Sequence, residues 1–295
     1  MKDSEKHRQF KKERRVQLKS ALKIRKDTYA EIVRLLTQAE KDTKALLTDY
    51  PTEYQAYYLP QLQTQIKEIL SQVAKQSGKT IEQGANSSWQ SGVDLIDRPL
   101  IAGGVQISGM LPIISTKQLV AMRSFMVDRI ENVSFHLANK VSSQLGLAMI
   151  GSQTIGESVT NIQRLFKNQG RTRALTIVRT ELGRAYSVAT HERMLQASKI
   201  LPGLKKQWRR SGKVHSRLSH DDIDGQIREP HKKFQLGNGV ELRFPRDPKA
   251  PAAETINCGC EELPIMEDWE VQHPDRKPFS ELEKQLNPRK GNYEG

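Results

Sequence analysis

Apolar residues recur at intervals of three and four over the first two-thirds of the chain, which is the spacing of one face of an α-helix. Residues 29–47 carry the first regular stretch, and the Tyr50-Pro51 step that follows it disfavours helical backbone. A second apolar face begins after Pro60, and the sequence Ser-Gly-Lys at 77–79 is typical of a helix end. The pattern therefore predicts two helices separated by a loop.

The next segment, residues 81–116, is less regular because it holds five glycines and two prolines. Such residues favour turns, so we expect a helix around Trp89 combined with loops. After this segment the three-and-four spacing returns and continues to about residue 150. That stretch predicts a long amphipathic helix over 117–150.

A pair of helices is predicted at 152–168 and 172–198, with Gly170 between them. After Pro202 the pattern changes to alternating polar and apolar residues, which is typical of strands, and the sequence Gly-Asn-Gly at 237–239 predicts a tight turn. Helices that lead into strands favour an α+β fold over repeated βαβ units. We expect an extended helical N-terminal part and a small C-terminal module with a helix pair and short antiparallel strands.

Hydrophobic residues make up 36% of the chain and the mean hydropathy is −0.64, values that fit long amphipathic helices with much solvated surface. The final residues, PRKGNYEG, have the composition of a frayed end. The patterns divide the chain into four segments: a basic arm (1–28), a helical region (29–150), a C-terminal module (151–265) and a C-terminal tail (266–295).

Positive charge is high and unevenly placed. The net charge is +13, and residues 1–30 hold eleven Lys and Arg against four Asp and Glu, a net charge of +7 in a tenth of the chain. This density favours sequence-independent binding to DNA phosphates by a basic helix or a disordered arm, although such a run is also typical of a solvated helix face. The DNA contacts are predicted at Lys6, Arg8, Lys11, Lys12, Arg14, Arg15 and Lys19.

The sequence has no apolar run near the roughly 20 residues of a membrane span, and its N-terminus lacks the apolar stretch of a secretory signal. The chain is therefore expected to remain in the cytoplasm where it is made, without a membrane partner. Cys258 and Cys260 are the two cysteines and are separated by one residue, so a disulfide between them would be strained. Reduced thiols are expected.

These two thiols form part of a candidate metal site, because Gly259 between them allows the chain to bend so that both sulfurs face one way. A four-coordinate zinc site would also need a nearby histidine and aspartate: His215 or His220, and Asp221, Asp222 or Asp224. The predicted zinc ligands are Cys258, Cys260, His220 and Asp222. The alternative is that two buried thiols simply pack beside Trp208.

The segment 215–226 also invites a hydrolase interpretation, because a histidine base and clustered carboxylates can activate water and hold a cation. However, its three aspartates fall within four residues and end in Asp224-Gly225, which is a strong turn signal. Turn formation is favoured over catalysis, and the sequence predicts no catalytic residue.

A series of short motifs occupies roughly the C-terminal third to two-fifths of the chain, in this order: Arg-Thr-Glu (179–181), Trp208, His220, Asp-Gly (224–225), Phe234, Phe-Pro-Arg-Asp-Pro (244–248) and Asn-Cys-Gly-Cys (257–260). The combination resembles the phage Mu protein F-like minor head proteins. The resemblance implies that residues 151–265 are a Mu F-like head morphogenesis module. The structural motif residues that it implies are Arg179, Glu181, Trp208, Asp224, Gly225 and Asn257.

Within this motif, Glu181 and Arg184 lie three residues apart on one helix face and can pair. The place of Arg179 and Glu181 in the family motif implies that they tie their helix to the strands through buried hydrogen bonds. The alternative is a solvated helix face.

The resemblance implies a structural protein of a tailed double-stranded DNA phage or prophage, present in few copies at the portal vertex of the head. The partners that it implies are the portal protein, the major capsid or scaffold proteins, and packaged DNA. The expected location is the virion head, with the host cytoplasm during assembly. Two alternatives remain open: a metal-dependent nuclease or hydrolase, and a DNA-binding assembly factor that is not retained in the virion.

Overall fold

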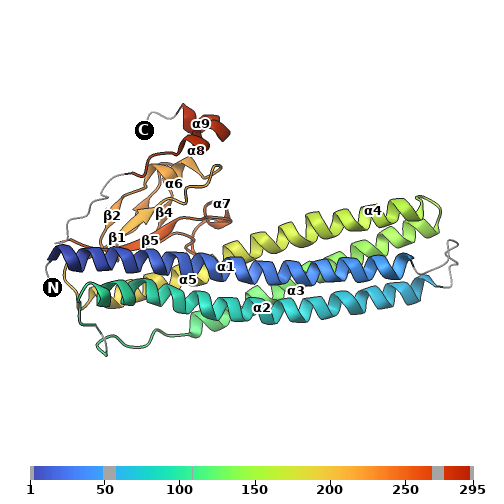
Figure 1. Cartoon of the computed structure of the whole chain (residues 1–295), viewed down its shortest axis with the longest axis horizontal. Helices are drawn as coiled ribbons and strands as arrows, with labels where there is room; N and C mark the ends of the chain where they lie inside the picture. The colour runs from blue at the N-terminus through green and yellow to red at the C-terminus, as the bar shows by residue number, and fades with distance from the viewer. Residues whose placement is uncertain (1–2, 49–57, 108, 268–275, 293–295) are drawn as a thin grey trace. The chain divides into compact units, whose positions relative to one another are not determined.

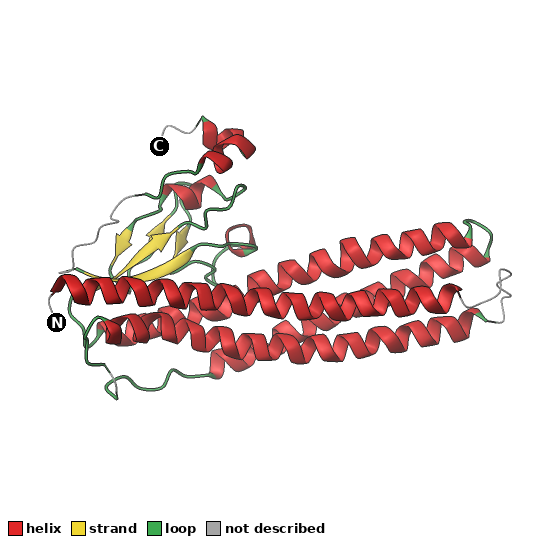
Figure 2. Cartoon of the chain, viewed as in Figure 1, coloured by secondary structure: helices red, strands yellow, loops and turns green. Residues whose placement is uncertain are grey.

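The computed structural model describes residues 3–48, 58–107, 109–267 and 276–292. Long helices dominate the described residues, and a few short antiparallel strands follow them, so the α+β prediction is confirmed (Figures 1 and 2). The long helices are α1 (Asp3–Thr48), α2 (Leu59–Ala102), α3 (Lys117–Met149) and α5 (Thr172–Ser198), and α5 is preceded by α4 (Ile155–Leu165) and the six-residue π-helix η1 (Phe166–Arg171). The short helices are α6 (Leu218–Asp222), α7 (Ala252–Thr255), α8 (Glu281–Leu286) and α9 (Pro288–Gly291). The strands are β1 (Leu204–Arg209), β2 (Ile227–Arg228), β3 (Phe234–Gln235), β4 (Glu241–Leu242) and β5 (Glu261–Met266).

The chain divides into two compact units. The strand-bearing unit comprises Met1–Ile24, Asn86–Leu119 and Arg179–Gly295. The helical unit comprises Arg25–Ala85 and Val120–Val178. Helix α1 is continuous through residues 28 and 29, where the basic arm and the helical region were expected to meet.

The prediction that a helix ends at 77–79 is wrong, because α2 continues through Gly78. A Cβ at Gly78 would lie 2.8 Å from Oε1 of Glu131 on α3, and one at Gly92 would lie 2.4 Å from the carbonyl oxygen of Tyr186 on α5. These glycines lie at close helix–helix contacts, within the helical unit and the strand-bearing unit respectively. At Gly92 the backbone of α5 leaves no room for a side chain, whereas at Gly78 the nearest atom is the end of the flexible Glu131 side chain. In the sequence they look like helix ends.

The helix expected around Trp89 is the end of α2, which continues to Ala102, and the described residues from there to 116 are irregular. Helix α3 agrees with the predicted helix 117–150 within one residue. The predicted break at Gly170 is absent, because η1 joins α4 to α5 without interruption and Gly170 is buried near Leu137. The step at 50–51 lies outside the described residues.

The strand-bearing unit contains a three-stranded antiparallel sheet in the order β2-β1-β5 and a separate β3-β4 hairpin. The hairpin turns at 237–239 as predicted, and the carbonyl oxygen of Leu236 accepts from the N–H of Gly239. A buried cluster lies beneath the hairpin and the sheet: Trp208, Ile223, Phe234, Leu236, Leu242, Cys258 and Cys260. A second cluster joins the sheet to helices of the same unit: Phe10, Ile96, Leu100, Ile107, Met194, Ala197 and Leu204.

The described part of the predicted tail is not frayed, because α8 and α9 are anchored by buried charges. A carboxylate oxygen of Glu283 accepts from Arg210 of the segment after β1 at 2.6 Å and from Nζ of Lys290 at 2.8 Å. Asn287 also donates to the carbonyl oxygen of Val214 at 2.8 Å. The final residues 293–295 of that tail lie outside the described part of the chain.

Candidate functional site

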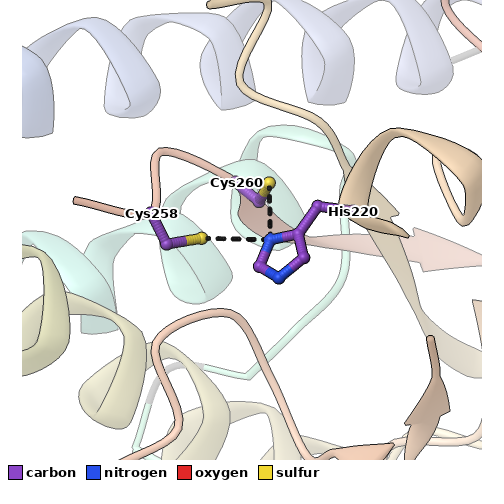
Figure 3. A group of neighbouring side chains, drawn as sticks. All are labelled: His220, Cys258 and Cys260. Carbon is purple, nitrogen blue, oxygen red and sulfur yellow. Dashed lines mark hydrogen bonds between the residues drawn. The ribbon is translucent and has the colours of Figure 1, made fainter. Parts of the chain in front are cut away.

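Three of the four predicted zinc ligands meet in the interior of the strand-bearing unit. His220 comes from α6, whereas Cys258 and Cys260 come from the segment that leads into β5 (Figure 3). Nδ1 of His220 lies 3.6 Å from Sγ of Cys258 and 3.7 Å from Sγ of Cys260. All three ligand atoms lie within 4.8 Å of one another and all three residues are buried.

The backbone around the cysteines explains why both sulfurs reach the same nitrogen. Asn257 has a positive φ of 57°, a left-handed conformation that asparagine tolerates better than most residues, and its N–H donates to Oγ1 of Thr180 on α5. A Cβ at Gly259 would lie 2.8 Å from Cβ of Ser211 and 2.9 Å from Cε of Lys213. The Asn-Cys-Gly-Cys sequence therefore allows a bend that most other residues would obstruct.

Trp208 on β1 holds α6 in place beside the cysteines. Its indole N–H donates to the carbonyl oxygen of His220 at 3.1 Å, and the two rings meet edge to face with centroids 5.3 Å apart. Trp208 belongs to the same buried cluster as both cysteines, so the expected packing of the thiols beside it is also present. Packing and metal binding are therefore compatible at this site.

Glu254 on α7 was not assigned to the site from the sequence. Its Oε2 lies 2.8 Å from Nε2 of His220, and its Oε1 accepts from the side-chain amide of Asn238 at 2.9 Å. Glu254 was among the residues that carry the family resemblance, four positions before Cys258, but its 34-position separation from His220 hid the contact between them. The imidazole thus has sulfurs on one ring nitrogen and a carboxylate on the other.

Asp222 does not join this cluster. It is exposed, and its Oδ1 accepts from the guanidinium of Arg276 at 2.9 Å. Asp224 is buried at the predicted turn, where it accepts from the backbone N–H groups of Arg210 and Lys277. The carboxylates of Asp222 and Asp224 therefore have partners separate from those of His220.

The thiols and the imidazole influence each other's ionisation. A hydrogen bond from Cys260 holds the pKa of Cys258 well below its usual value, and the same bond, together with burial, raises the pKa of Cys260. Burial acts to lower the pKa of His220, but the hydrogen bonds and charges of Cys258 and Glu254 outweigh it, so that pKa is raised. One thiolate and one carboxylate thus surround the imidazole with negative charge.

The buried hydrogen bonds predicted between α5 and the strand region are made largely by residues other than Arg179 and Glu181. Arg179 is exposed, and Glu181 is buried and pairs with Arg184 at 2.5 Å, as the spacing predicts. Thr180 between them accepts from Asn257, so the middle residue of the Arg-Thr-Glu motif provides the link.

Arg246 is a buried cation that sequence reasoning did not single out. Its guanidinium donates to the carbonyl oxygens of Gly183 and Cys258, to Oγ of Ser187, and to Glu261 at 2.7 Å. Arg246 therefore connects α5, the cysteine segment and β5. Its place in Phe-Pro-Arg-Asp-Pro is the only signal in the sequence.

The basic residues of α1 do not all lie on one surface. A hollow along one face of the helix is lined by Ser4, His7, Arg8, Lys11, Lys12, Arg15, Val16 and Lys19. Of the predicted DNA contacts, Lys6 does not line this hollow, and Arg14 donates to the carbonyl oxygen of Pro264 at 3.0 Å. Burial lowers the pKa of Arg14 to about 10. Five of the seven predicted contacts share this face, which we call the basic face (Arg8, Lys11, Lys12, Arg15 and Lys19).

No protein-family model matches the chain, and no solved structure matches it. The uncharacterized protein YqbB of Bacillus subtilis is 36% identical over 118 residues, which are 38% of this chain and 38% of that protein. The NAD(+)–arginine ADP-ribosyltransferase EFV of Enterococcus faecalis is 29% identical over 115 residues, 38% of this chain and 23% of that protein. The chain therefore spans less than half the length of each of these relatives. None of the described helices has the length and apolar character needed to cross a membrane.

Proposed function

We propose that this chain is a minor head protein of a tailed double-stranded DNA phage or prophage and that it acts in head morphogenesis at the portal vertex. The observation that carries the proposal is the use of the motif residues, which hold one another in place. Thr180 bonds Asn257, Trp208 bonds the backbone of His220, and Asp224 ties the turn after α6 to the backbone N–H of Arg210. These contacts fit motif residues whose role is to maintain the fold, as the resemblance to the Mu F-like proteins implies.

A hydrolase is less well supported by the same residues. The catalytic interpretation needs His220, Asp222 and Asp224 to face one substrate, but Asp222 bonds Arg276 and Asp224 bonds backbone N–H groups. The match to EFV spans 23% of that protein, so its named transferase activity is not proposed for this chain.

The proposed partners are the portal protein, the major capsid or scaffold proteins, and packaged DNA, with the virion head as the final location and the host cytoplasm as the site of assembly. The basic face supports the DNA contact, because its arginines and lysines project from a helix without interleaved aromatic side chains that would stack on bases. Binding of this kind depends on phosphate charge and not on base sequence.

The test is to purify heads from a producing host and to measure by mass spectrometry the ratio of this chain to the portal subunit. A low and reproducible ratio, at or below that of the portal, is expected. Absence from heads, with the protein soluble in the lysate, would contradict the proposal and favour an assembly factor that does not remain in the particle. A control with heads treated with high salt separates bound protein from protein that merely adheres to exposed DNA.

A further inference from the structure

The cluster of His220, Cys258 and Cys260 has the dimensions of a metal site. In a tetrahedral zinc site the bonds are about 2.3 Å to sulfur and about 2.0 Å to nitrogen, which places sulfur and nitrogen about 3.5 Å apart. The observed separations from Nδ1 are 3.6 Å and 3.7 Å. Both nitrogen–sulfur separations are therefore close to those expected for ligands of one shared ion.

Hydrogen bonds alone explain the arrangement less well. A ring nitrogen of histidine carries either one proton or one lone pair, so it forms one good hydrogen bond. Here the sulfurs of Cys258 and Cys260 both approach Nδ1 of His220, as the two dashed lines in Figure 3 show. A cation bound by both sulfurs and the nitrogen satisfies all three groups at once.

Glu254 provides the second feature of a metal centre. Histidine ligands commonly donate their other ring N–H to a carboxylate, which fixes the tautomer and the orientation of the ring. The 2.8 Å contact between Nε2 of His220 and Glu254 places the proton on Nε2 and leaves the Nδ1 lone pair facing the sulfurs. Asn238 in turn holds Glu254 through the other carboxylate oxygen.

We propose that His220, Cys258 and Cys260 bind a zinc ion and that Glu254 orients the histidine ligand. Thiolate and imidazole ligands bind zinc in preference to magnesium or calcium, which prefer oxygen ligands. The ion joins α6 to the segment before β5 across 38 positions of sequence. The ion would stabilise the module, because strands β2, β3 and β4 have two residues each and a small module of this kind gains stability from a bound metal.

The test begins with the metal content of the full-length protein, expressed with zinc and purified without chelators or immobilised metal. About one zinc per chain is expected, and Cys258→Ser and Cys260→Ser should each retain only a small fraction of it. Asp222→Asn is the matched control, because Asp222 lies in the same sequence segment as His220 but bonds Arg276. Zinc content that survives both cysteine substitutions would overturn the proposal, and so would a folded wild-type protein without zinc.

Because a cysteine variant can fail to fold, the coordination shell is also measured in the wild-type protein. X-ray absorption at the zinc edge should show two sulfur neighbours at about 2.3 Å and nitrogen or oxygen neighbours at about 2.0 Å. A shell without sulfur would show that the zinc is adventitious and would overturn the proposal. Glu254→Gln keeps all three ligands and is expected to weaken zinc binding about 10- to 100-fold in competition with a chelator. Unchanged affinity in that variant would remove Glu254 from the site.

Discussion

The two compact units bury different kinds of polar side chain. Among the residues that the structure describes, the buried polar side chains of the helical unit all carry hydroxyl groups: Thr28, Thr43, Ser77, Ser134 and Ser158. The strand-bearing unit buries charged groups of both signs, including Lys206, Arg210 and Arg246. A buried charge is costly unless it is paired and hydrogen-bonded. The strand-bearing unit therefore depends on specific partners, whereas the helical unit depends on continuous apolar faces.

The partners of the buried cations come from distant parts of the sequence. Each pair joins two different segments of the strand-bearing unit: Lys206 with Glu262 at 3.7 Å, Arg210 with Glu283 at 2.6 Å, and Arg246 with Glu261 at 2.7 Å. Such pairs do not necessarily add net stability relative to apolar residues, but removal of the cation takes a charge partner and hydrogen bonds from an acidic side chain that the fold has desolvated. Single substitutions at these positions should therefore act on one unit far more than on the other.

Tryptophan fluorescence can separate the two units experimentally. All three tryptophans, Trp89, Trp208 and Trp269, fall in the sequence ranges of the strand-bearing unit. A Trp269→Phe background leaves Trp89 and Trp208, which are both buried, as reporters. Hydrogen exchange of peptides from 25–85 reports on the helical unit in the same samples.

The largest effect is expected from Arg246→Met. Arg246 is fully buried, and its loss removes the hydrogen bonds to Gly183, Ser187 and Cys258 and the ion pair with Glu261. The tryptophan-detected free energy of unfolding should fall by about 3–5 kcal/mol, with little change in hydrogen exchange at 25–85. Arg246→Lys keeps the charge with fewer hydrogen-bond donors, so its free energy of unfolding should lie between those of the wild type and Arg246→Met. An equal loss of protection from hydrogen exchange in both units would contradict the contrast between them, because the two units would then unfold together.

The converse substitution is Leu70→Ala in the helical unit. Leu70 is 1% exposed on α2, and its truncation removes apolar contacts and leaves a cavity. A loss of about 2–5 kcal/mol is expected in the protection of peptides from 25–85. The tryptophan-detected transition should move much less. Leu46→Ala, at a partly exposed position of the same unit, is the matched control and should cost less.

The contrast also explains which parts of the molecule could be predicted from the sequence. Helix α3 was predicted almost to the residue, because a helix face repeats locally and its apolar positions are visible in one dimension. Gly78 and Gly170 were misinterpreted as helix boundaries, since a glycine inside a helix looks the same in sequence as one that ends a helix.

The same limit applied to the candidate site. His220, Cys258 and Cys260 were found because their residue types are rare and chemically distinctive. Asp222 was preferred over Glu254 because it is near His220 in sequence, whereas the contact with Glu254 depends on the fold. Charge density correctly marked the N-terminus as basic, but it could not show that Arg14 packs against Pro264, 250 positions away.

A smaller effect is expected from acid and from Glu283→Gln. Burial acts to raise the pKa of Glu283, but hydrogen bonds from Arg210 and Lys290 outweigh burial and hold that pKa well below its usual value near 4.5. Lys290 also lies 3.4 Å from Asp221. A group with a lowered pKa stabilises the fold above its usual pKa and loses that contribution as the pH falls toward its folded-state value. Tryptophan-detected stability should therefore decrease as the pH falls below about 4.5.

The variant Glu283→Gln should lower stability at pH 7 by about 1–3 kcal/mol and flatten the acid dependence, because it loses the charge-assisted bonds. Glu281→Gln is its control, since Glu281 lies two residues away on the same helix and is exposed. If both variants keep the steep acid dependence, the acid sensitivity arises from other carboxylates of the unit.

The smallest effect on stability is expected at the basic face, where the strand-bearing unit exposes charge and does not bury it. Arg8, Lys12, Arg15 and Lys19 are exposed, so their joint replacement by Glu should change the free energy of unfolding only slightly, about 0.5 kcal/mol per site or less. DNA affinity should fall strongly, and the slope of log affinity against log salt should decrease by up to about 4, because each lost phosphate contact removes about one unit.

A matched control places the same change of charge in the helical unit. Four exposed lysines there, Lys41, Lys44, Lys67 and Lys75, are replaced by Glu, and binding to the same DNA duplex is measured at several salt concentrations. If binding depends on the basic face, the control should keep most of the salt slope of the wild type. Equal losses of DNA affinity in the two variants would mean that net charge alone governs DNA binding. The electrostatic field of the net charge acts on the duplex from any surface, whereas a defined phosphate contact acts from a single surface.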